Sequence, residues 1–369
     1  MPSLPHGADY EVLIAGAGPA GAVCATLLAR AGIRVLLANG ASGRKPRPTE
    51  VFSPATLRLI RHLELPAPDA SRGTRTCRGV LSVWGLPGEQ FFDYGLYACG
   101  QALMVDRQAY DALLVAAARA AGAAVLPSAR PIAIERQEAG WRAADRHVNF
   151  IIDASGRTGS GVPQAIAPRR FDDRLVSFTT FHRGADIDTD VLLLEAVKDG
   201  WWYVAHHASG VSCIVYLSDA DLVPRGEEAR ADHLRRSFAA TRLIRERLGA
   251  PPAFVDHRVI DARTSERTRL AGATWLAVGD AAFSTDPLSG EGMRHALASA
   301  DRAAAATVSL LRTGAEGALD AYAAWCREEH ADQLHRWRDA YRAVAPRFHG
   351  ELFWRRRIDG GAGERELAG

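Results

Sequence analysis

The chain has 369 residues, which is enough for one or two domains with a large core. Hydrophobic residues make up 47% and charged residues 24%, a balance that is typical of folded globular proteins and excludes a disordered chain. With 45 Lys and Arg against 43 Asp and Glu, the net charge of +2 gives no long-range attraction to nucleic acid or lipid, so neither is expected as a partner.

The N-terminus lacks the basic start, apolar core and cleavage site of a secretory signal. The uncharged segment 12–29 is interrupted by glycines where a membrane helix would need continuous backbone bonding. We therefore expect a cytoplasmic protein without a membrane span. The five scattered cysteines form no Cys-x-x-Cys pair, so neither a disulfide scaffold nor a metal site is expected (Cys24, Cys77, Cys99, Cys213 and Cys326).

In chain order, the first 40 residues predict one βαβ unit, with strands at 10–15 and 35–37 around a helix at 20–31. The runs at 80–84 and 90–93 flank Gly and Pro and predict a hairpin. Buried strands of the parallel type recur at 150–153 and 275–278, whereas β-branched and aromatic runs between 171 and 263 predict antiparallel strands. Helices are expected at 53–63, 110–121, 227–248, 292–311 and 316–345.

Residues 16–21 read Gly-Ala-Gly-Pro-Ala-Gly, directly after a predicted strand and at the start of a predicted helix. Gly16 permits a tight turn, Gly18 lets the backbone approach a pyrophosphate, and Gly21 allows close packing of helix on strand. The amides at this helix N-terminus, around Ala20, are suited to hold the anion. Glycine-rich turns also serve packing alone, but the βαβ context favours a dinucleotide.

The second predicted strand ends at Asn39, where an acid normally accepts hydrogen bonds from ribose hydroxyls. An amide oxygen accepts the same bonds without charge, so they should be weaker. A neutral side chain would also tolerate a 2′-phosphate, so this position alone does not name the cofactor.

A second glycine-rich string, residues 279–293, follows a predicted strand and precedes a predicted helix. Asp280 is placed at the strand end to bind a polyol hydroxyl. Gly290 and Gly292 leave amides uncovered at the helix start, an arrangement suited to a delocalised negative charge. An N-cap and a turn would explain the Asp and one Gly, but not the whole string.

A third string lies between these two and reads Phe150-Ile-Ile-Asp-Ala-Ser-Gly-Arg157. Together the three strings resemble those of the flavin-dependent aromatic monooxygenase and tryptophan-halogenase-like superfamily. They come in that family's order and span residues 10–300. The resemblance implies FAD as cofactor, with Asn39 in place of the family's ribose-binding Glu. Arg107 matches an Arg that commonly reaches the cofactor, although it would also serve as a surface helix cap. The other cofactor positions that it implies are Gly16, Gly18, Ala20 and Gly21 at the pyrophosphate, Asp280 at the ribityl chain or pyrophosphate, and Pro287, Gly290, Gly292 and Met293 beside the flavin pyrimidine.

The expected fold class is therefore α/β: a three-layer, Rossmann-like FAD-binding domain of the glutathione-reductase type, with an inserted, mostly antiparallel substrate domain and a C-terminal helical segment. The FAD-binding domain is expected to consist of 8–43, 100–170 and 264–315. The substrate domain is expected at 44–99 and 171–263, the helical segment at 316–359 and a flexible tail at 360–369.

Finer strings indicate a branch of the superfamily. Thr49 to Pro54 is similar to the segment that touches the flavin in the halogenase-like branch, which places Glu50 at the cofactor. Shorter strings at 82–85, 200–203, 218–219 and 353–356 resemble flavoprotein maturation factors that hydroxylate a tryptophan of a partner oxidase, on the way to a protein-derived quinone cofactor. The chain has no Lys between Lys45 and Lys198 and no Trp-x-Trp-x-Ile-Pro box, both of which halogenating members carry, so the resemblance favours hydroxylation through a flavin C4a-hydroperoxide.

Hydroxylation needs a dry pocket with apolar walls, for which Trp84, Trp201, Trp202 and Tyr203 are the candidates, unless they are sheet core. His206 or His207 is a candidate base, and only one of them can face the pocket because they are adjacent in a strand. Glu50 is the second candidate base.

Two alternatives stay open: a small-molecule flavoprotein hydroxylase, oxidase or reductase of the same fold, and a non-catalytic FAD-binding scaffold or chaperone. No second glycine-rich βαβ unit for a nicotinamide is evident, so the electron donor or reductase is not identified.

Overall fold

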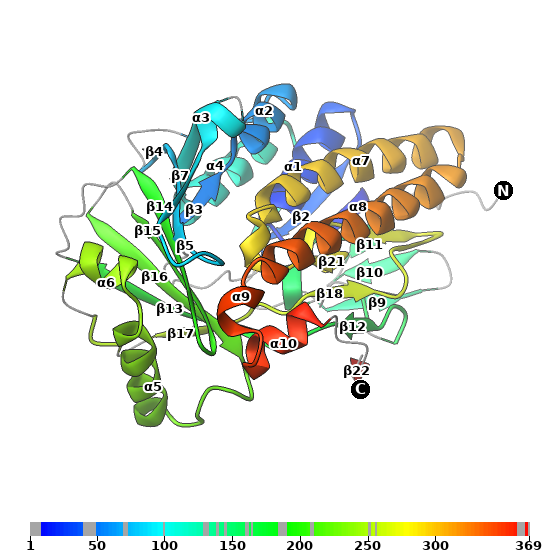
Figure 1. The fold of residues 1–369 in the computed structure, drawn as a ribbon. Coiled ribbons are helices and arrows are strands. Elements are labelled where there is room, and N and C mark those ends of the chain that lie inside the picture. Colours follow the sequence, from blue (N-terminus) through cyan, green and yellow to red (C-terminus); the bar gives the residue numbers. More distant parts are fainter. Residues whose placement is uncertain are drawn as a thin grey trace.

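The computed structural model places a large sheet with a parallel core beside a large antiparallel sheet (Figure 1). No helix in the described part of the chain is long and apolar enough to cross a bilayer. The residues described are 9–39, 49–68, 73–98, 100–127, 133–137, 140–143, 146–158, 162–163, 165–183, 190–206, 210–249, 252–254, 257–359 and 366–367.

The first sheet is built on the four apolar runs that the sequence predicted as buried parallel strands, and that prediction is confirmed. β1 (Tyr10–Ala15) pairs in parallel with β2 (Val35–Asn39) and β11 (Arg146–Asp153), and β11 pairs in parallel with β20 (Trp275–Ala277). Because the carboxyl ends of parallel strands meet at one edge, the segments that follow β1, β11 and β20 lie together there. The remaining strands of this sheet are β8 (Ala124–Pro127), β9 (Ile134–Arg136), β10 (Trp141–Ala143) and β19 (Ala271–Gly272).

Small side chains let the helices approach this sheet and one another closely. α1 (Pro19–Arg30) packs against α4 (Arg107–Ala120) and α7 (Gly292–Thr313), and its Ala22, Cys24 and Ala25 are fully buried. α8 (Gly317–Arg342) packs along α7 and extends toward the second sheet (Figure 1). The packing fixes the N-termini of α1 and α7 near the carboxyl edge of the sheet.

The second sheet has the strand order β17-β13-β16-β15-β14-β5-β6, and it is antiparallel except for the pairing of β14 with β5. The predicted hairpin is confirmed, because β5 (Gly79–Val83) and β6 (Gln90–Asp93) pair antiparallel. One face of this sheet packs under α5 (Glu227–Ala239), and the other packs against the C-terminal helices. Its other strands are β13 (Leu175–Arg183), β14 (Val191–Val197), β15 (Gly200–His206), β16 (Val211–Asp219) and β17 (Arg258–Asp261).

Two small sheets complete the strand pairing. β7 (Ala102–Asp106) lies between β3 (Thr49–Phe52) and β4 (Arg75–Cys77), so the predicted substrate segment 44–99 is divided between this sheet and the second sheet. The pairing satisfies the backbone of β7 on both sides, which local sequence does not reveal. The other small sheet has the order β21-β18-β12-β22, with β12 (Arg169–Phe171), β18 (Ser265–Arg267), β21 (Phe283–Ser284) and β22 (Glu366–Leu367), the last within the predicted tail.

The helix predicted at 227–248 is two helices, α5 (Glu227–Ala239) and α6 (Leu243–Leu248). The break has a buried cause: the carboxylate of Glu195 accepts hydrogen bonds from the backbone amides of Arg242 at 2.7 Å and Ile244 at 3.0 Å. These bonds hold the start of a new helix that local periodicity does not reveal. The remaining helices are α2 (Pro54–His62), α3 (Tyr94–Tyr97), α9 (Ala345–Phe348) and α10 (Leu352–Ile358).

Candidate active site

A single cavity of about 1260 Å³ is lined by both glycine-rich strings. Residues 15–20 contribute the turn after β1, and residues 285–293 contribute the loop before and into α7. The opposite wall comes from the second sheet, so the cavity extends from the strand ends of one sheet to the face of the other. The wall residues of the second sheet are Val80, Phe92, Ser177, Thr179, Leu192, Leu194, Trp201, Tyr203, Val215, Leu217, Arg258, Ile260 and Asp261.

The three glycines of the first turn have different physical reasons to be glycine. Gly16 has φ +118°, and a Cβ there would lie 2.3 Å from the Ala154 carbonyl oxygen. A Cβ on Gly21 would lie 1.9 Å from the Gly16 carbonyl oxygen. Gly18 has an ordinary extended backbone (φ −69°), and a Cβ there would meet no atom of the protein within 4 Å. The protein therefore leaves the space at Gly18 open to the cavity, and α1 begins there without a side-chain cap.

The second glycine-rich loop is held by the C-terminal helix α8. Asp286 accepts a hydrogen bond from the Leu288 amide at 2.9 Å and another from the Tyr341 hydroxyl at 2.9 Å. Burial raises the pKa of the Asp286 carboxyl. Gly290 adopts φ +62°, and α7 begins at Gly292 without a side-chain cap. Uncapped amides at the start of a 22-residue helix are suited to a negatively charged group.

Paired charges line the cavity between these loops. Arg107 at the start of α4 forms ion pairs with Glu50 on β3 and, at 3.3 Å, with Asp111. Burial alone would lower the pKa of the Arg107 guanidinium, but Glu50 and Asp111 outweigh burial and raise it. Asp280 forms an ion pair with Arg157 at 3.3 Å. Glu50 is thus engaged by Arg107, which suits a positioning role better than the acceptance of a proton.

Only two of the four predicted pocket aromatics line the cavity. Trp201 and Tyr203 point into it from β15, whereas Trp202, between them in the strand, packs on the other face of the sheet and donates to the Ser237 hydroxyl at 3.0 Å. The period-two alternation of a strand excludes Trp202 from the pocket. Trp84 also lies outside the lining, in a buried cluster with Trp201, Tyr341 and Trp354, and it donates to the Ala340 carbonyl at 2.7 Å.

The predicted histidines do not gather at the site. His206 is 3% exposed at the end of β15, its Nδ1 lies 2.9 Å from the Ser212 hydroxyl, and it does not line the cavity. By strand alternation it faces the opposite side of β15 from Tyr203. His207 lies outside the described residues, and so does the side chain of Asn39 at the end of β2.

Several lining residues were not assigned from the sequence. Arg157 ends the quoted string 150–157, and its guanidinium donates to the carbonyls of Arg263 at 2.8 Å and Thr285 at 3.0 Å. His295, two residues beyond Met293, lines the cavity with both ring nitrogens buried and without a hydrogen bond. Burial lowers the pKa of His295 to about 4. No local sequence pattern marks His295 as a lining residue, because a position two residues after Met293 lies about 200° around a helix.

The buried side chain of His206 should make the free energy of unfolding sensitive to acid. Burial lowers the pKa of His206 from about 6.5 to about 4, so the folded protein favours the neutral ring and stability falls as the pH drops from 6.5 through 4. We expect His206→Asn to remove up to about 3 kcal/mol of this fall. The free energy of unfolding of both proteins is measured at pH 7 and at pH 4. An equal fall between the two pH values in the wild type and the variant would contradict the prediction.

A Rossmann-like sheet with two uncapped helix N-termini at one cavity defines a dinucleotide-binding protein, and the open space at Gly18 fits a pyrophosphate. The chain belongs to the FAD binding domain family, whose model matches residues 9–337. Its cofactor is FAD, and the protein is a flavin-dependent monooxygenase by family. The expected fold class is confirmed.

Several flavin-dependent proteins are similar to this chain over most of its length. The chain is 26% identical over 362 residues to LodB of Marinomonas mediterranea, described as an FAD-dependent oxidoreductase, and covers 97% of it. It is 26% identical over 330 residues to a tryptophan 2-halogenase of Chondromyces crocatus, 61% of whose length it covers. Among solved structures, the peptidyl tryptophan dihydroxylase QhpG is 25% identical with a TM-score of 0.80, over 98% of this chain and 81% of that one. The halogenase CmlS, 22% identical with a TM-score of 0.81, shares the fold.

Proposed function

We propose that this chain hydroxylates an electron-rich aromatic ring, the indole of a tryptophan side chain in a peptide or protein. The observation that carries the proposal is the shared cavity, in which a cofactor cradle faces an apolar and aromatic wall without any lysine among the described lining residues. The similarity to QhpG, a peptidyl tryptophan dihydroxylase, supports the substrate class.

The cradle residues would bind and orient FAD. The amides after Gly18 would hold the pyrophosphate, Asp280 would accept from a polyol hydroxyl, and the uncapped amides at Gly290 and Gly292 would face the flavin ring. When bound and reduced, FAD supplies the activation of dioxygen. Arg107, held by Glu50 and Asp111, would line the cofactor side of the cavity.

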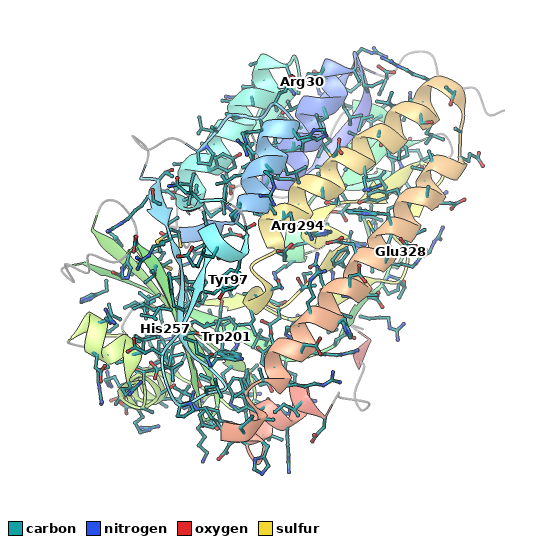
Figure 2. All side chains as sticks on the ribbon, turned by 45° about the horizontal axis from the view of Figure 1, so that its top comes forward. Arg30, Tyr97, Trp201, His257, Arg294 and Glu328 are labelled. Carbon is teal, nitrogen blue, oxygen red and sulfur yellow. The ribbon has the colours of Figure 1, made fainter. Side chains whose placement is uncertain are left out.

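The wall residues would place the ring and exclude water. Trp201 donates from Nε1 to the Tyr341 hydroxyl at 2.8 Å, and Tyr341 donates to Asp286 at 2.9 Å, so this wall is tied to the second glycine-rich loop. Trp201 is labelled in the lower left half of Figure 2, near His257. Such a chain of hydrogen bonds fixes the distance between the aromatic wall and the cofactor cradle, as directed oxygen transfer requires. The apolar wall would exclude water and so limit the competing release of hydrogen peroxide.

The experiment supplies reduced FAD enzyme with ¹⁸O₂ and a tryptophan-containing peptide, acetyl-Val-Thr-Leu-Trp-Leu-Thr-Val-amide. We expect a product that carries one ¹⁸O atom on the indole ring, seen by mass spectrometry. A matched reaction in H₂¹⁸O with ordinary dioxygen should leave the product unlabelled. Hydrogen peroxide as the sole product would contradict the proposal, and a chlorinated ring in the presence of chloride would indicate a halogenase.

A further inference from the structure

Large apolar side chains gather on the surface formed by β6 and α3. Phe92, Leu96 and Tyr97, here called the rim patch, are 44%, 76% and 68% exposed. The rings of Phe92 and Tyr97 stack with centroids 5.2 Å apart, so the patch has an ordered surface. Tyr97 can be found on α3 in Figure 2. A contiguous exposed apolar patch of this kind is typical of an interaction site.

The strand beneath the patch has a free edge. β6 is the terminal strand of the second sheet, and it pairs with β5 on one side only among the described strands. Proteins usually protect such edges with charges, prolines or a covering segment, because an open edge recruits other chains. β6 contains no proline, and it presents Phe92 on the cavity side of the sheet and Phe91 on the other side. An extended peptide can pair with an open edge through its backbone and use neighbouring apolar surface for its side chains.

The patch is continuous with the active-site cavity. Phe92 belongs both to the rim patch and to the cavity lining, and Tyr94 and Ala98 from the same segment also line the cavity. A chain segment seated on β6 would therefore lie at the cavity entrance. A side chain of that segment could reach the aromatic wall while the backbone stays on the rim.

The charges of the cavity disfavour a free amino acid. Every carboxylate in the described lining already has a partner: Glu50 pairs with Arg107, Asp261 with Arg263, Asp280 with Arg157, Glu291 with Arg294, and Asp286 accepts from Tyr341. A free α-ammonium group would find no unpaired acid there and would lose its hydration. A tryptophan whose α-amino group is part of an amide bond avoids that cost.

We propose that the rim patch and the open edge of β6 dock an extended, apolar segment of a partner polypeptide, whose aromatic side chain enters the cavity. The inference rests on the proposed function and deepens it, because it names the surface that binds the polypeptide carrying the ring. A second copy of this chain and a free small molecule are the competing occupants.

The experiment measures binding to the oxidised FAD protein by calorimetry, so that no turnover is needed. The probes are acetyl-Val-Thr-Leu-Trp-Leu-Thr-Val-amide and N-acetyl-tryptophan amide. We expect the peptide to bind at least about 10-fold more tightly than the amide. The double variant Leu96→Ser/Tyr97→Ser should lose that advantage while its flavin spectrum and its affinity for the amide stay unchanged. Leu352→Ser, which removes an exposed leucine (40%) far along the chain, is the matched control and should behave as the wild type.

Equal affinity for peptide and amide, or an undiminished peptide advantage in the double variant, would overturn the docking surface. A wild-type dimer that the double variant dissociates in sedimentation would show that a second copy covers the patch, and would also overturn it. The proposed function fails separately, since absence of ¹⁸O transfer with intact peptide selectivity would reject the chemistry and keep the surface.

Discussion

Gly18→Val is expected to yield a folded, colourless protein. The backbone at Gly18 is extended (φ −69°, ψ −179°), which suits a β-branched residue, and a Cβ there would meet no protein atom within 4 Å. The new side chain would instead occupy the space where the backbone must approach a pyrophosphate. We expect FAD affinity to fall at least about 100-fold, which corresponds to about 2.7 kcal/mol. Titration of the apoprotein with FAD, followed by flavin fluorescence, measures this loss.

The neighbouring glycine supplies the contrast. Gly21→Ala would place a Cβ 1.9 Å from the Gly16 carbonyl oxygen and 2.9 Å from the Ala154 side chain, so its defect should be in folding. Thermal unfolding without FAD should therefore separate the two: Gly18→Val melts as the wild type does, and Gly21→Ala melts earlier. If Gly18→Val bound FAD as the wild type does, the pyrophosphate would not lie at this turn.

The parts of the fold that the sequence predicted depend on local pattern. The strands around residues 13 and 151 are short apolar runs, and their parallel pairing follows from burial on both faces. The glycine-rich strings are also local features. Gly16 and Gly290 adopt positive φ, which favours glycine at these positions whatever the distant parts of the chain do. The cavity between the strings was expected from the resemblance to flavoproteins, in which both strings hold one cofactor.

The parts that could not be predicted depend on distant partners. Trp201 and Trp202 are alike in sequence, and their separation into cavity and core follows from which sheet face α5 covers. Tyr341 lies 55 residues from Asp286, so local sequence gives no sign that it holds the second glycine-rich loop. His206 was a candidate base because the sequence does not show which side of the strand its ring occupies. Strand alternation fixes which residues share a face, but not which face is the site.

The largest loss of stability is expected from Arg267→Met. Arg267 and Asp153 form a fully buried ion pair at 2.7 Å, with both side chains 0% exposed. The same guanidinium donates to the carbonyls of Ala281 at 3.0 Å and Ala167 at 3.0 Å. It thus joins the end of β11 to the segment around Asp280. Methionine has a similar length but no charge, so it would leave the Asp153 carboxylate buried without its cation.

We expect Arg267→Met to lower the free energy of unfolding by about 3–5 kcal/mol, because the cost is that of an uncompensated buried charge. Urea unfolding should show a lower midpoint with an unchanged slope. Arg34→Met is the matched control: Arg34 is 60% exposed in its ion pair with Glu11, and its loss should cost under about 1 kcal/mol. Adding Asp153→Asn to Arg267→Met removes the stranded charge, so the double variant should lose less than the two single losses combined. Similar losses for the Arg267 and Arg34 variants would show that the buried pair does not hold these segments together.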